Sequence, residues 1–193
     1  MTTFDRAELL ELVRQEALQI GSFTLASGKT ASYYLDCRLV TLHPRGANQI
    51  AAGMLALIDK ITPSVAAVGG MAIGADPIAA AIVTLAGQRP ETAEQPALRG
   101  FMVRKEPKGH GAGRQVEGPV KAGQRVVIVE DVITSGGSAI KAAEAARAFG
   151  LEVVKVIGIV DRLAGGREAF AAAGLELETL FTIRDFGLEP DVG

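Results

Sequence analysis

The chain has 193 residues, of which 48% are hydrophobic, and its 20 Lys plus Arg against 22 Asp plus Glu give a formal net charge of −2. A chain of this length suits one domain, or one domain with a small annex, and can bury an adequate core. General nucleic-acid binders are strongly basic, so the near-neutral charge argues against a nucleic-acid partner. Any anionic ligand must therefore be held by a local basic cluster.

The cysteine content and the N-terminal residues indicate the cellular compartment. The single cysteine, Cys37, rules out a disulfide framework and fits a reducing cytoplasm. No Cys or His stands near it at metal-ligand spacing, so we expect a structural thiol. Residues 1–14 contain acidic side chains and no apolar run of signal-peptide length, and no segment reaches the roughly 18 to 20 apolar residues of a membrane span. We therefore expect a cytoplasmic protein with no membrane partner.

The beginning of the chain predicts two helices and a strand. Leucine, valine and isoleucine recur at helical spacing behind an Asp5 cap, which predicts an amphipathic helix that ends at Gly21. A strand is predicted at Ser32–Asp36, after a turn-rich stretch, and a helix at Ala47–Ile61. These elements do not alternate regularly, so we expect residues 1–60 to form largely a small annex.

Strands and helices alternate in the rest of the chain. The predicted strands are Ser64–Val68, Arg99–Arg104, Arg125–Val129, Val153–Val160 and Leu177–Ile183. The predicted helices are Pro77–Ala86, Ser138–Phe149 and Glu168–Ala173. We expect Asp76 to cap the first of these helices, with Pro77 as its first residue. The alternation indicates βαβ units, so the predicted fold class is α/β with a parallel sheet covered on both faces.

The most informative stretch is Val126–Ser138, VVIVEDVITSGGS. It begins as a buried strand, which leads into the carboxylates Glu130 and Asp131 and then into a loop before a helix. Ligands of parallel α/β sheets bind beyond the carboxyl ends of the strands, so we expect a binding site here. The loop Thr134–Ser138 offers backbone N–H groups, hydroxyls and a helix N-terminus, which together can hold a phosphate.

The two carboxylates distinguish this loop from a plain phosphate site. An anion would be repelled by Glu130 and Asp131, but sugar hydroxyls or a cation near a reacting carbon would not. The stretch therefore predicts a sugar-phosphate site, with an ordinary helix-cap loop and surface acids as the alternative. It has neither Walker spacing nor the Gly-x-Gly-x-x-Gly fingerprint, which argues against an NTPase or a dehydrogenase.

A basic loop is the second informative stretch. Residues 103–114, VRKEPKGHGAGR, contain four Arg or Lys and one Glu, and three glycines deny the loop regular structure. Such a loop is often only a solvated connection. The alternative is a lid that closes over a polyanion, neutralises it and excludes water.

These stretches resemble a known family. Residues 126–138 are similar to the phosphoribosyl-pyrophosphate motif of the type I phosphoribosyltransferases, in which a hydrophobic strand runs into two acids and a Thr/Ser/Gly loop. The basic loop is similar to the flexible catalytic loop of the orotate phosphoribosyltransferases within that superfamily. The other segments that resemble this family are Ser27–Lys29, Tyr33–Asp36 with Arg38, Glu117-Gly118 and Asp161-Arg162.

The resemblance implies a fold and a reaction. The fold is a parallel sheet flanked by helices with a small N-terminal hood, in which residues 1–193 form one domain and residues 1–60 contribute largely to the hood. The reaction transfers the 5-phosphoribosyl group from phosphoribosyl pyrophosphate to orotate and gives orotidine 5′-monophosphate and pyrophosphate, with Mg²⁺ as cofactor. A homodimer is implied, in which the basic loop acts in trans. The alternatives are a purine phosphoribosyltransferase and a nucleotide-binding regulatory protein on the same fold.

The resemblance also implies residue roles. The catalytic residues are Lys105, Lys108, His110 and Asp131. The residues that bind phosphoribosyl pyrophosphate are Arg104, Lys105, Lys108, His110, Glu130, Asp131, Val132, Ile133, Thr134, Ser135, Gly136, Gly137 and Ser138. Orotate contacts Thr134, Arg162 and Tyr34, and Arg162 pairs with its carboxylate. No protein side chain is assigned as a metal ligand.

Some positions remain open at this stage. Tyr33 and Tyr34 could both wall the pyrimidine, or one of them could belong to the core. Ala26 and Ile73 stand where many family members carry lysine, so no phosphate role is assigned to them. The run Gly74–Pro77 fits either a pyrophosphate loop or plain helix capping, and His43 is expected to be structural.

Overall fold

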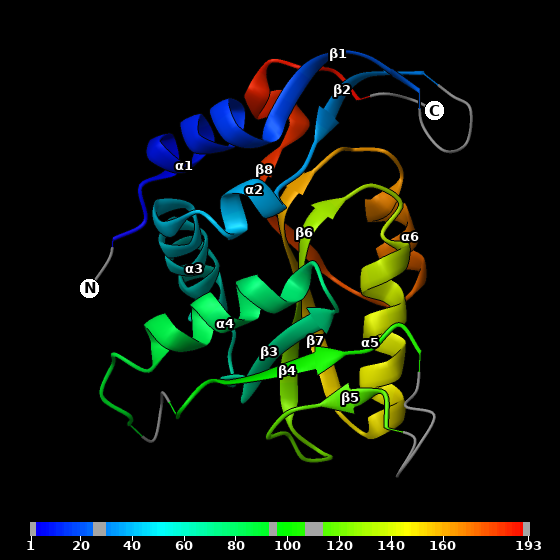
Figure 1. Cartoon of the computed structure of the whole chain (residues 1–193). Coiled ribbons are helices and arrows are strands. Elements are labelled where there is room, and N and C mark those ends of the chain that lie inside the picture. Colours follow the sequence, from blue (N-terminus) through cyan, green and yellow to red (C-terminus); the bar gives the residue numbers. More distant parts are fainter. Residues whose placement is uncertain (1–2, 25–29, 93–95, 107–113, 191–193) are drawn as a thin grey trace.

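The computed structural model describes residues 3–24, 30–92, 96–106 and 114–190. A six-stranded sheet with the order β5-β4-β3-β6-β7-β8 forms its centre, and helices cover both faces (Figure 1). The strands of this sheet are β3 (Ala67–Met71), β4 (Arg99–Val103), β5 (Val116–Glu117), β6 (Arg125–Ile133), β7 (Glu152–Asp161) and β8 (Leu177–Thr182). All its neighbouring strands pair in parallel except β4 and β5, which confirms the predicted α/β class.

Five helices flank the central sheet in the described part of the chain. They are α3 (Pro44–Ile58), α4 (Ala75–Ala86), α5 (Gly137–Phe149), α6 (Gly166–Ala172) and the 3-10 helix η2 (Ile183–Phe186). A second, two-stranded sheet of β1 (Leu18–Thr24) and β2 (Thr30–Leu35) lies at one end of the molecule (Figure 1). Its strand β1 contacts the π-helix η1 (Val13–Ala17), which in turn packs with α1 (Arg6–Leu12) and α2 (Arg38–Thr41). We call these five elements, residues 6–41, the hood.

Within the described ranges, no helix is both long and apolar enough to traverse a bilayer.

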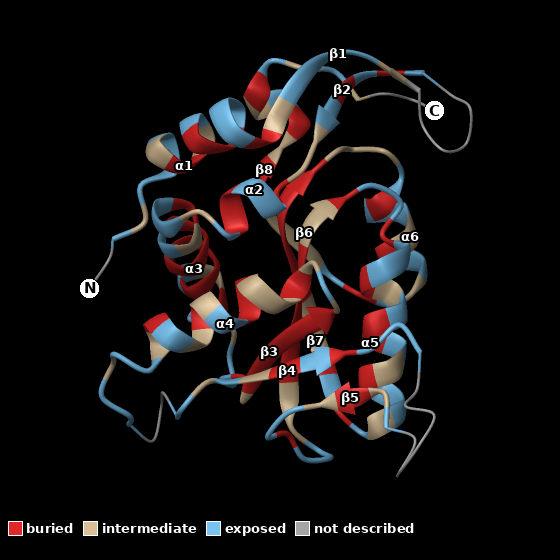
Figure 2. Cartoon of the chain, in the orientation of Figure 1, coloured by how far each residue is buried: buried red, intermediate tan, exposed pale blue. Residues whose placement is uncertain are grey.

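The apolar strand β6 lies at the centre of the sheet because both of its faces are covered. Val127 and Val129 join a core that includes residues of α3, α4 and the hood. Val126 and Ile128, which point to the other face, join a core that includes residues of α5. Figure 2 shows the resulting band of buried residues through the sheet. A strand buried on both faces carries a continuous apolar run, as predicted for this segment.

The prediction of the first helix is wrong for the second half of that segment. Asp5 does cap α1, and its carboxylate accepts hydrogen bonds from the N–H groups of Ala7 and Glu8 at 2.9 and 3.0 Å. The chain then passes through η1 and becomes β1 at Leu18, where a helix to Gly21 was predicted. Antiparallel pairing of β1 with β2 satisfies the backbone of this segment and overrides its helical spacing.

Other boundaries also differ from the predictions. Strand β3 is shifted towards Gly69, where an added Cβ would collide with the carbonyl oxygen of Phe101. Only glycine allows strands to approach so closely there. Helix α4 begins at Ala75 without a side-chain cap, so the prediction that Asp76 caps it is wrong. Helix α3 begins at Pro44, and the His43 side chain caps it by accepting a hydrogen bond from Gly46 N–H at 3.3 Å.

Candidate active site

Strand β6 carries two adjacent carboxyl groups to the carboxyl edge of the sheet. Both lie within the strand, which continues to Ile133, whereas the sequence predicted its end at Val129. Glu130 is buried, and its Oε2 atom has no hydrogen-bond partner among the described residues. Burial, together with the neighbouring Asp131 charge, raises the pKa of Glu130 to about 8. A buried carboxyl oxygen without a partner is an acceptor suited to a ligand hydroxyl.

The loop after β6 forms the start of α5. Gly136 has a left-handed backbone with φ of 77°, and a Cβ there would lie 3.0 Å from Cζ of Phe170, so this turn requires glycine. Helix α5 has no side-chain cap and no acidic residue in its first turn. Thr134, Ser135 and Ser138 are exposed around that helix end. Uncapped N–H groups beside hydroxyls suit a bound phosphate.

Two segments distant in sequence adjoin Asp131. An added Cβ at Gly74, in the turn before α4, would lie 3.4 Å from its Oδ1 atom. Cys37 is fully buried, and burial with the charges of Asp131 and Asp36 raises the pKa of its thiol well above the usual value. A buried thiol that stays protonated is unreactive, in line with the expected structural role. The hood and the turn before α4 therefore both border the β6 carboxylates.

Arg162 follows β7 at the same edge of the sheet. Its backbone N–H donates to the Ile133 carbonyl oxygen at 2.9 Å, which places it beside the loop that follows β6. Its Nε–H donates to the Tyr33 hydroxyl at 3.1 Å, and its guanidinium carbon lies 4.8 Å from the centre of the Tyr33 ring. Tyr33 is buried, whereas Tyr34, the predicted base contact, is exposed and packs on Phe23. The Tyr33 contact has no signal in the sequence, because 129 positions separate it from Arg162.

The basic loop leaves the sheet at the end of β4. The Arg104 N–H donates to the Gln115 carbonyl oxygen at 2.9 Å, which closes the base of the loop, and the Arg104 guanidinium lies 3.2 Å from the Glu117 carboxylate. Lys105 is exposed. Strand β3 pairs with both β4 and β6, so the loop begins at the edge that holds Glu130, about 10 Å away by two strand spacings.

Several predicted residues lie outside the described part of the chain. They are Lys108, His110, Ala26 and the turn Ser27–Lys29. Val132 and Ile133 are the last residues of β6, and Gly137 and Ser138 are the first of α5. The described residues of the phosphoribosyl-pyrophosphate motif therefore lie together at one edge of the sheet, with Arg162 next to them.

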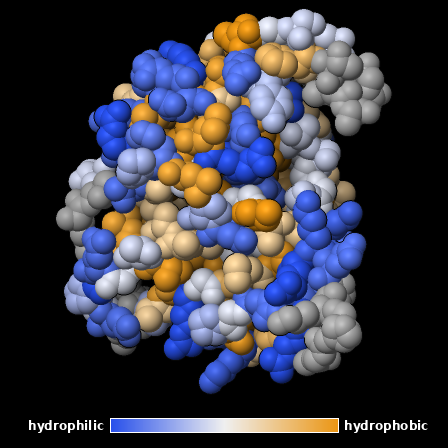
Figure 3. All heavy atoms as spheres, in the orientation of Figure 1, coloured by the Kyte–Doolittle hydropathy of each residue, from blue (hydrophilic) through white to orange (hydrophobic). Residues whose placement is uncertain are grey.

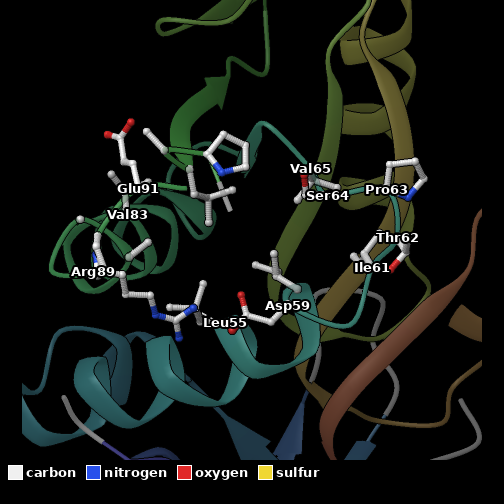
Figure 4. Close-up of a pocket in the computed structure, with 17 residues that line it drawn as sticks. Leu55, Asp59, Ile61, Thr62, Pro63, Ser64, Val65, Val83, Arg89 and Glu91 are labelled. Atoms are coloured by element: carbon white, nitrogen blue, oxygen red, sulfur yellow. Dashed lines mark hydrogen bonds and ion pairs between the residues drawn. The ribbon is translucent and has the colours of Figure 1, made fainter. Parts of the chain in front are cut away.

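A large cavity lies at the opposite end of the sheet. It has a volume of about 640 Å³ and opens between α3, α4 and the chain that leads into β3 (Figure 4). Leu55 and Val83 line it, and Asp59 and Arg89 form an ion pair of 2.7 Å at its wall. Sites in parallel α/β sheets occur at the carboxyl ends of the strands, so we place the active site by its chemistry and not by cavity size.

The family model of the phosphoribosyl transferase domain matches residues 75–173. The match includes the β6 carboxylates, the loop Thr134–Ser138, the basic loop and Arg162. Fold and site together define the chain as a phosphoribosyltransferase of type I.

Relatives narrow this class further. The orotate phosphoribosyltransferase of Rhodopirellula baltica is 66% identical over 192 residues, which cover 96% of each chain. The crystal structure of the Mycobacterium tuberculosis orotate phosphoribosyltransferase in complex with Fe(III) dicitrate has a TM-score of 0.81 at 42% identity, covering 95% of this chain and 99% of that one. The same protein with bound phosphoribosyl diphosphate has a TM-score of 0.77 at 39% identity, with the same coverage. The chain belongs to the orotate phosphoribosyltransferase family.

Proposed function

We propose that the protein transfers the 5-phosphoribosyl group from phosphoribosyl pyrophosphate to orotate and releases orotidine 5′-monophosphate and pyrophosphate. One observation carries the proposal beyond family membership. The backbone of Arg162, which would select the base, is hydrogen-bonded at 2.9 Å to Ile133 of the strand that would hold the ribose. The residues for both substrates thus lie side by side.

The phosphoribosyl group would be held by β6 and α5. The loop Thr134–Ser138 and the first N–H groups of α5 bind its 5-phosphate. Asp131 and Glu130, whose Oε2 atom has no partner among the described residues, accept hydrogen bonds from the ribose hydroxyls. N1 of orotate bonds to C1 of the ribose and loses its proton to solvent. The bond from C1 to the pyrophosphate oxygen breaks, and its electron pair leaves with the pyrophosphate. Positive charge then develops on the ribose next to the Asp131 carboxylate, which stabilises it.

The leaving pyrophosphate gains negative charge in the same step. The basic loop is proposed to close over it, with Arg104, Lys105, Lys108 and His110 as donors. Arg104 already stands at the base of the loop, where it pairs with Glu117 at 3.2 Å, and Lys105 is exposed next to it. Closure also excludes water, which would otherwise hydrolyse the ribosyl cation.

Magnesium is part of the proposal. Among the described residues no group of three His, Cys, Asp or Glu side chains could enclose a metal ion. Mg²⁺ commonly binds through substrate phosphates, waters and only one or two carboxylates. The Glu130–Asp131 pair would supply those carboxylates. The ion, when bound, neutralises charge on the leaving pyrophosphate.

Base selection is proposed to depend on charge. Orotate is an anion, and the Arg162 guanidinium can form a bidentate pair with its carboxylate. Thr134 is exposed next to this position and can donate a hydrogen bond to the pyrimidine. A neutral purine would leave the arginine without a counter-charge, which makes a purine phosphoribosyltransferase the weaker alternative.

We further propose a cytoplasmic homodimer in which the basic loop acts in trans. Support comes from exposed large apolar side chains. Leu39, Leu42 and Ile73 are 51%, 72% and 78% exposed, and they lie close in sequence to Cys37 and Gly74, which border the site. Figure 3 shows one face of the molecule, on which hydrophobic atoms interrupt a hydrophilic surface. Exposed apolar surface of this kind is found at subunit interfaces.

Mixed subunits test the trans arrangement. Lys108→Ala and Asp131→Asn proteins, each inactive alone, should regain about a quarter of wild-type activity after unfolding and refolding together, because half of the dimers are hybrids with one complete site each. No recovery after mixing, despite hybrid formation shown by a tagged subunit, would contradict action in trans.

The reaction itself is tested by the loss of orotate absorbance after the protein is mixed with Mg²⁺ and phosphoribosyl pyrophosphate. Parallel samples contain adenine, hypoxanthine or uracil, and one orotate sample contains EDTA. We expect consumption of orotate alone, abolished by EDTA. Consumption of a purine would favour the purine enzyme, and no consumption of any base would favour the regulatory protein.

A further inference from the structure

We propose that Tyr33 is a positioning residue that determines specificity for orotate, because it holds the Arg162 guanidinium in the orientation that receives the orotate carboxylate. The inference rests on the proposed function, since it concerns the arginine that would select the base. Tyr33 itself need not touch the substrate. Its effect would pass through Arg162.

Two contacts from one side chain fix the guanidinium. The Nε–H of Arg162 donates to the Tyr33 hydroxyl at 3.1 Å, and the guanidinium carbon lies 4.8 Å from the ring centre, within cation–π range. A hydrogen bond alone would let the group rotate about the bond, and a ring contact alone would let it slide across the ring. Together they set both its position and its plane.

Tyr33 is rigid enough to act in this way. It is 1% exposed and belongs to the main hydrophobic core. In β2 it pairs with Ile20 of β1, so its backbone is held by the small sheet. Arg162, in contrast, is only half-buried on a long and flexible side chain. A fixed neighbour lowers the entropy lost when such a side chain binds its ligand.

The neighbouring tyrosine shows that the contact is specific to Tyr33. Side chains alternate along β2, so Tyr34 points to the other face, where it is 44% exposed and its ring centre lies 5.9 Å from that of Phe23. Tyr33 therefore links the hood to the end of β7, across 129 positions of sequence. A guanidinium held in this way can donate two parallel hydrogen bonds to a carboxylate, a group that uracil lacks.

The test compares Tyr33→Phe, which removes only the hydroxyl, with Tyr33→Leu, which also removes the ring. We expect the KM for orotate to rise about 3-fold in the first variant and about 10-fold in the second, less than on loss of Arg162 itself, because a less ordered guanidinium loses more entropy when it binds the carboxylate. The KM for phosphoribosyl pyrophosphate and kcat should change less than about twofold, because the interaction affects base binding alone. Discrimination between orotate and uracil should fall by the same factors as orotate affinity.

A control and a double variant separate positioning from general damage to the hood. Leu9→Val weakens the packing of α1 in the same core without removing either contact to Arg162, and should leave the orotate KM unchanged. Tyr33→Phe should add no further effect in an Arg162→Leu background, because the hydroxyl acts only through that side chain. If Tyr33→Leu does not fold, as judged by circular dichroism, the Phe variant still carries the test.

Three results would overturn the proposal: an unchanged orotate KM in Tyr33→Phe, equal increases in both KM values, or full additivity with Arg162→Leu. Wild-type protein that consumes no orotate would contradict the proposed function itself. The two failures are thus distinguishable.

Discussion

On the side of the site proposed to bind the phosphoribosyl group, here called the phosphoribosyl side, β6, the loop after it and α5 follow one another in the chain. The side proposed to bind the base, here called the base side, instead joins Tyr33 of the hood to Arg162 across 129 positions. The first region is shaped by local backbone rules: a buried strand, a left-handed glycine and an uncapped helix. The second exists only when the hood packs on the sheet. Contiguous chemistry can therefore be recognised as a motif, whereas chemistry assembled by packing cannot.

The largest effect is expected at the leaving group, which belongs to neither region. Replacing Lys108 with Ala should lower kcat about 100-fold, because one donor to developing charge contributes on the order of 2.7–4 kcal/mol. Steady-state turnover at saturating substrates measures it. Lys121→Ala, an exposed lysine before β6 at the other end of the sheet, is the matched control. Unchanged turnover in Lys108→Ala would remove the loop from the mechanism and leave only the two compared regions.

Replacement of Arg162 with Leu should separate the two regions. We expect the KM for orotate to rise about 30-fold, through loss of a charge-assisted bidentate pair worth roughly 2 kcal/mol, while the KM for phosphoribosyl pyrophosphate stays near the wild-type value. Titration of each ligand checks this, with Arg184→Leu, an exposed arginine, as control. Equal weakening of both ligands would show that the regions do not act separately.

The phosphoribosyl side contains a buried carboxyl group, and its effect on the free energy of unfolding should depend on pH. The pKa of Glu130 rises from 4.5 to about 8 on folding, so between these values the native state binds more protons than the unfolded state. The free energy of unfolding of the unliganded protein should therefore fall as pH rises from 5 to 8. Glu130→Gln should not show this fall. The difference in the free energy of unfolding between the variant and wild type should therefore shift in favour of the variant by more than about 1.4 kcal/mol between pH 5 and pH 8.

Urea denaturation at several pH values measures this difference. Glu144→Gln, on the exposed face of α5, controls for removal of a carboxylate and should follow the wild-type curve. Parallel curves for wild type and Glu130→Gln would mean that Glu130 is not buried in the unliganded protein.

The smallest effect concerns the local geometry of the phosphate loop. Gly136 and Gly165 both have left-handed backbones, with φ of 77° and 88°, but only a Cβ at Gly136 would meet Phe170, at 3.0 Å. Both Ala variants should be destabilised by backbone strain, Gly136→Ala by about 1 kcal/mol more. Thermal unfolding compares them. Equal losses of stability in the two variants would mean that the Phe170 ring moves to accommodate the added methyl group. The loop would then be less constrained than its packing indicates.

The structure of the phosphoribosyl side could be predicted from the sequence because each of its features depends on neighbouring residues. An apolar run predicts a strand buried on both faces, and small hydroxyl and glycine residues after Asp131 predict a phosphate loop at a helix start. The α/β alternation likewise follows from local periodicity. Local patterns failed where tertiary contacts compete with them, as at Leu18, where pairing with Leu35 converts a helical pattern into a strand.

From the amino-acid sequence alone we could predict the class of fold, a sugar-phosphate motif and, through resemblance, an arginine proposed to select the base. The three-dimensional packing was needed to show that β6 continues through Glu130, that the hood borders Asp131 and that Tyr33 contacts Arg162. The difference arises from the range of the interactions. Periodicity, caps and turns depend on a few neighbouring residues, whereas burial and side-chain contacts depend on which distant segments the packed core brings together.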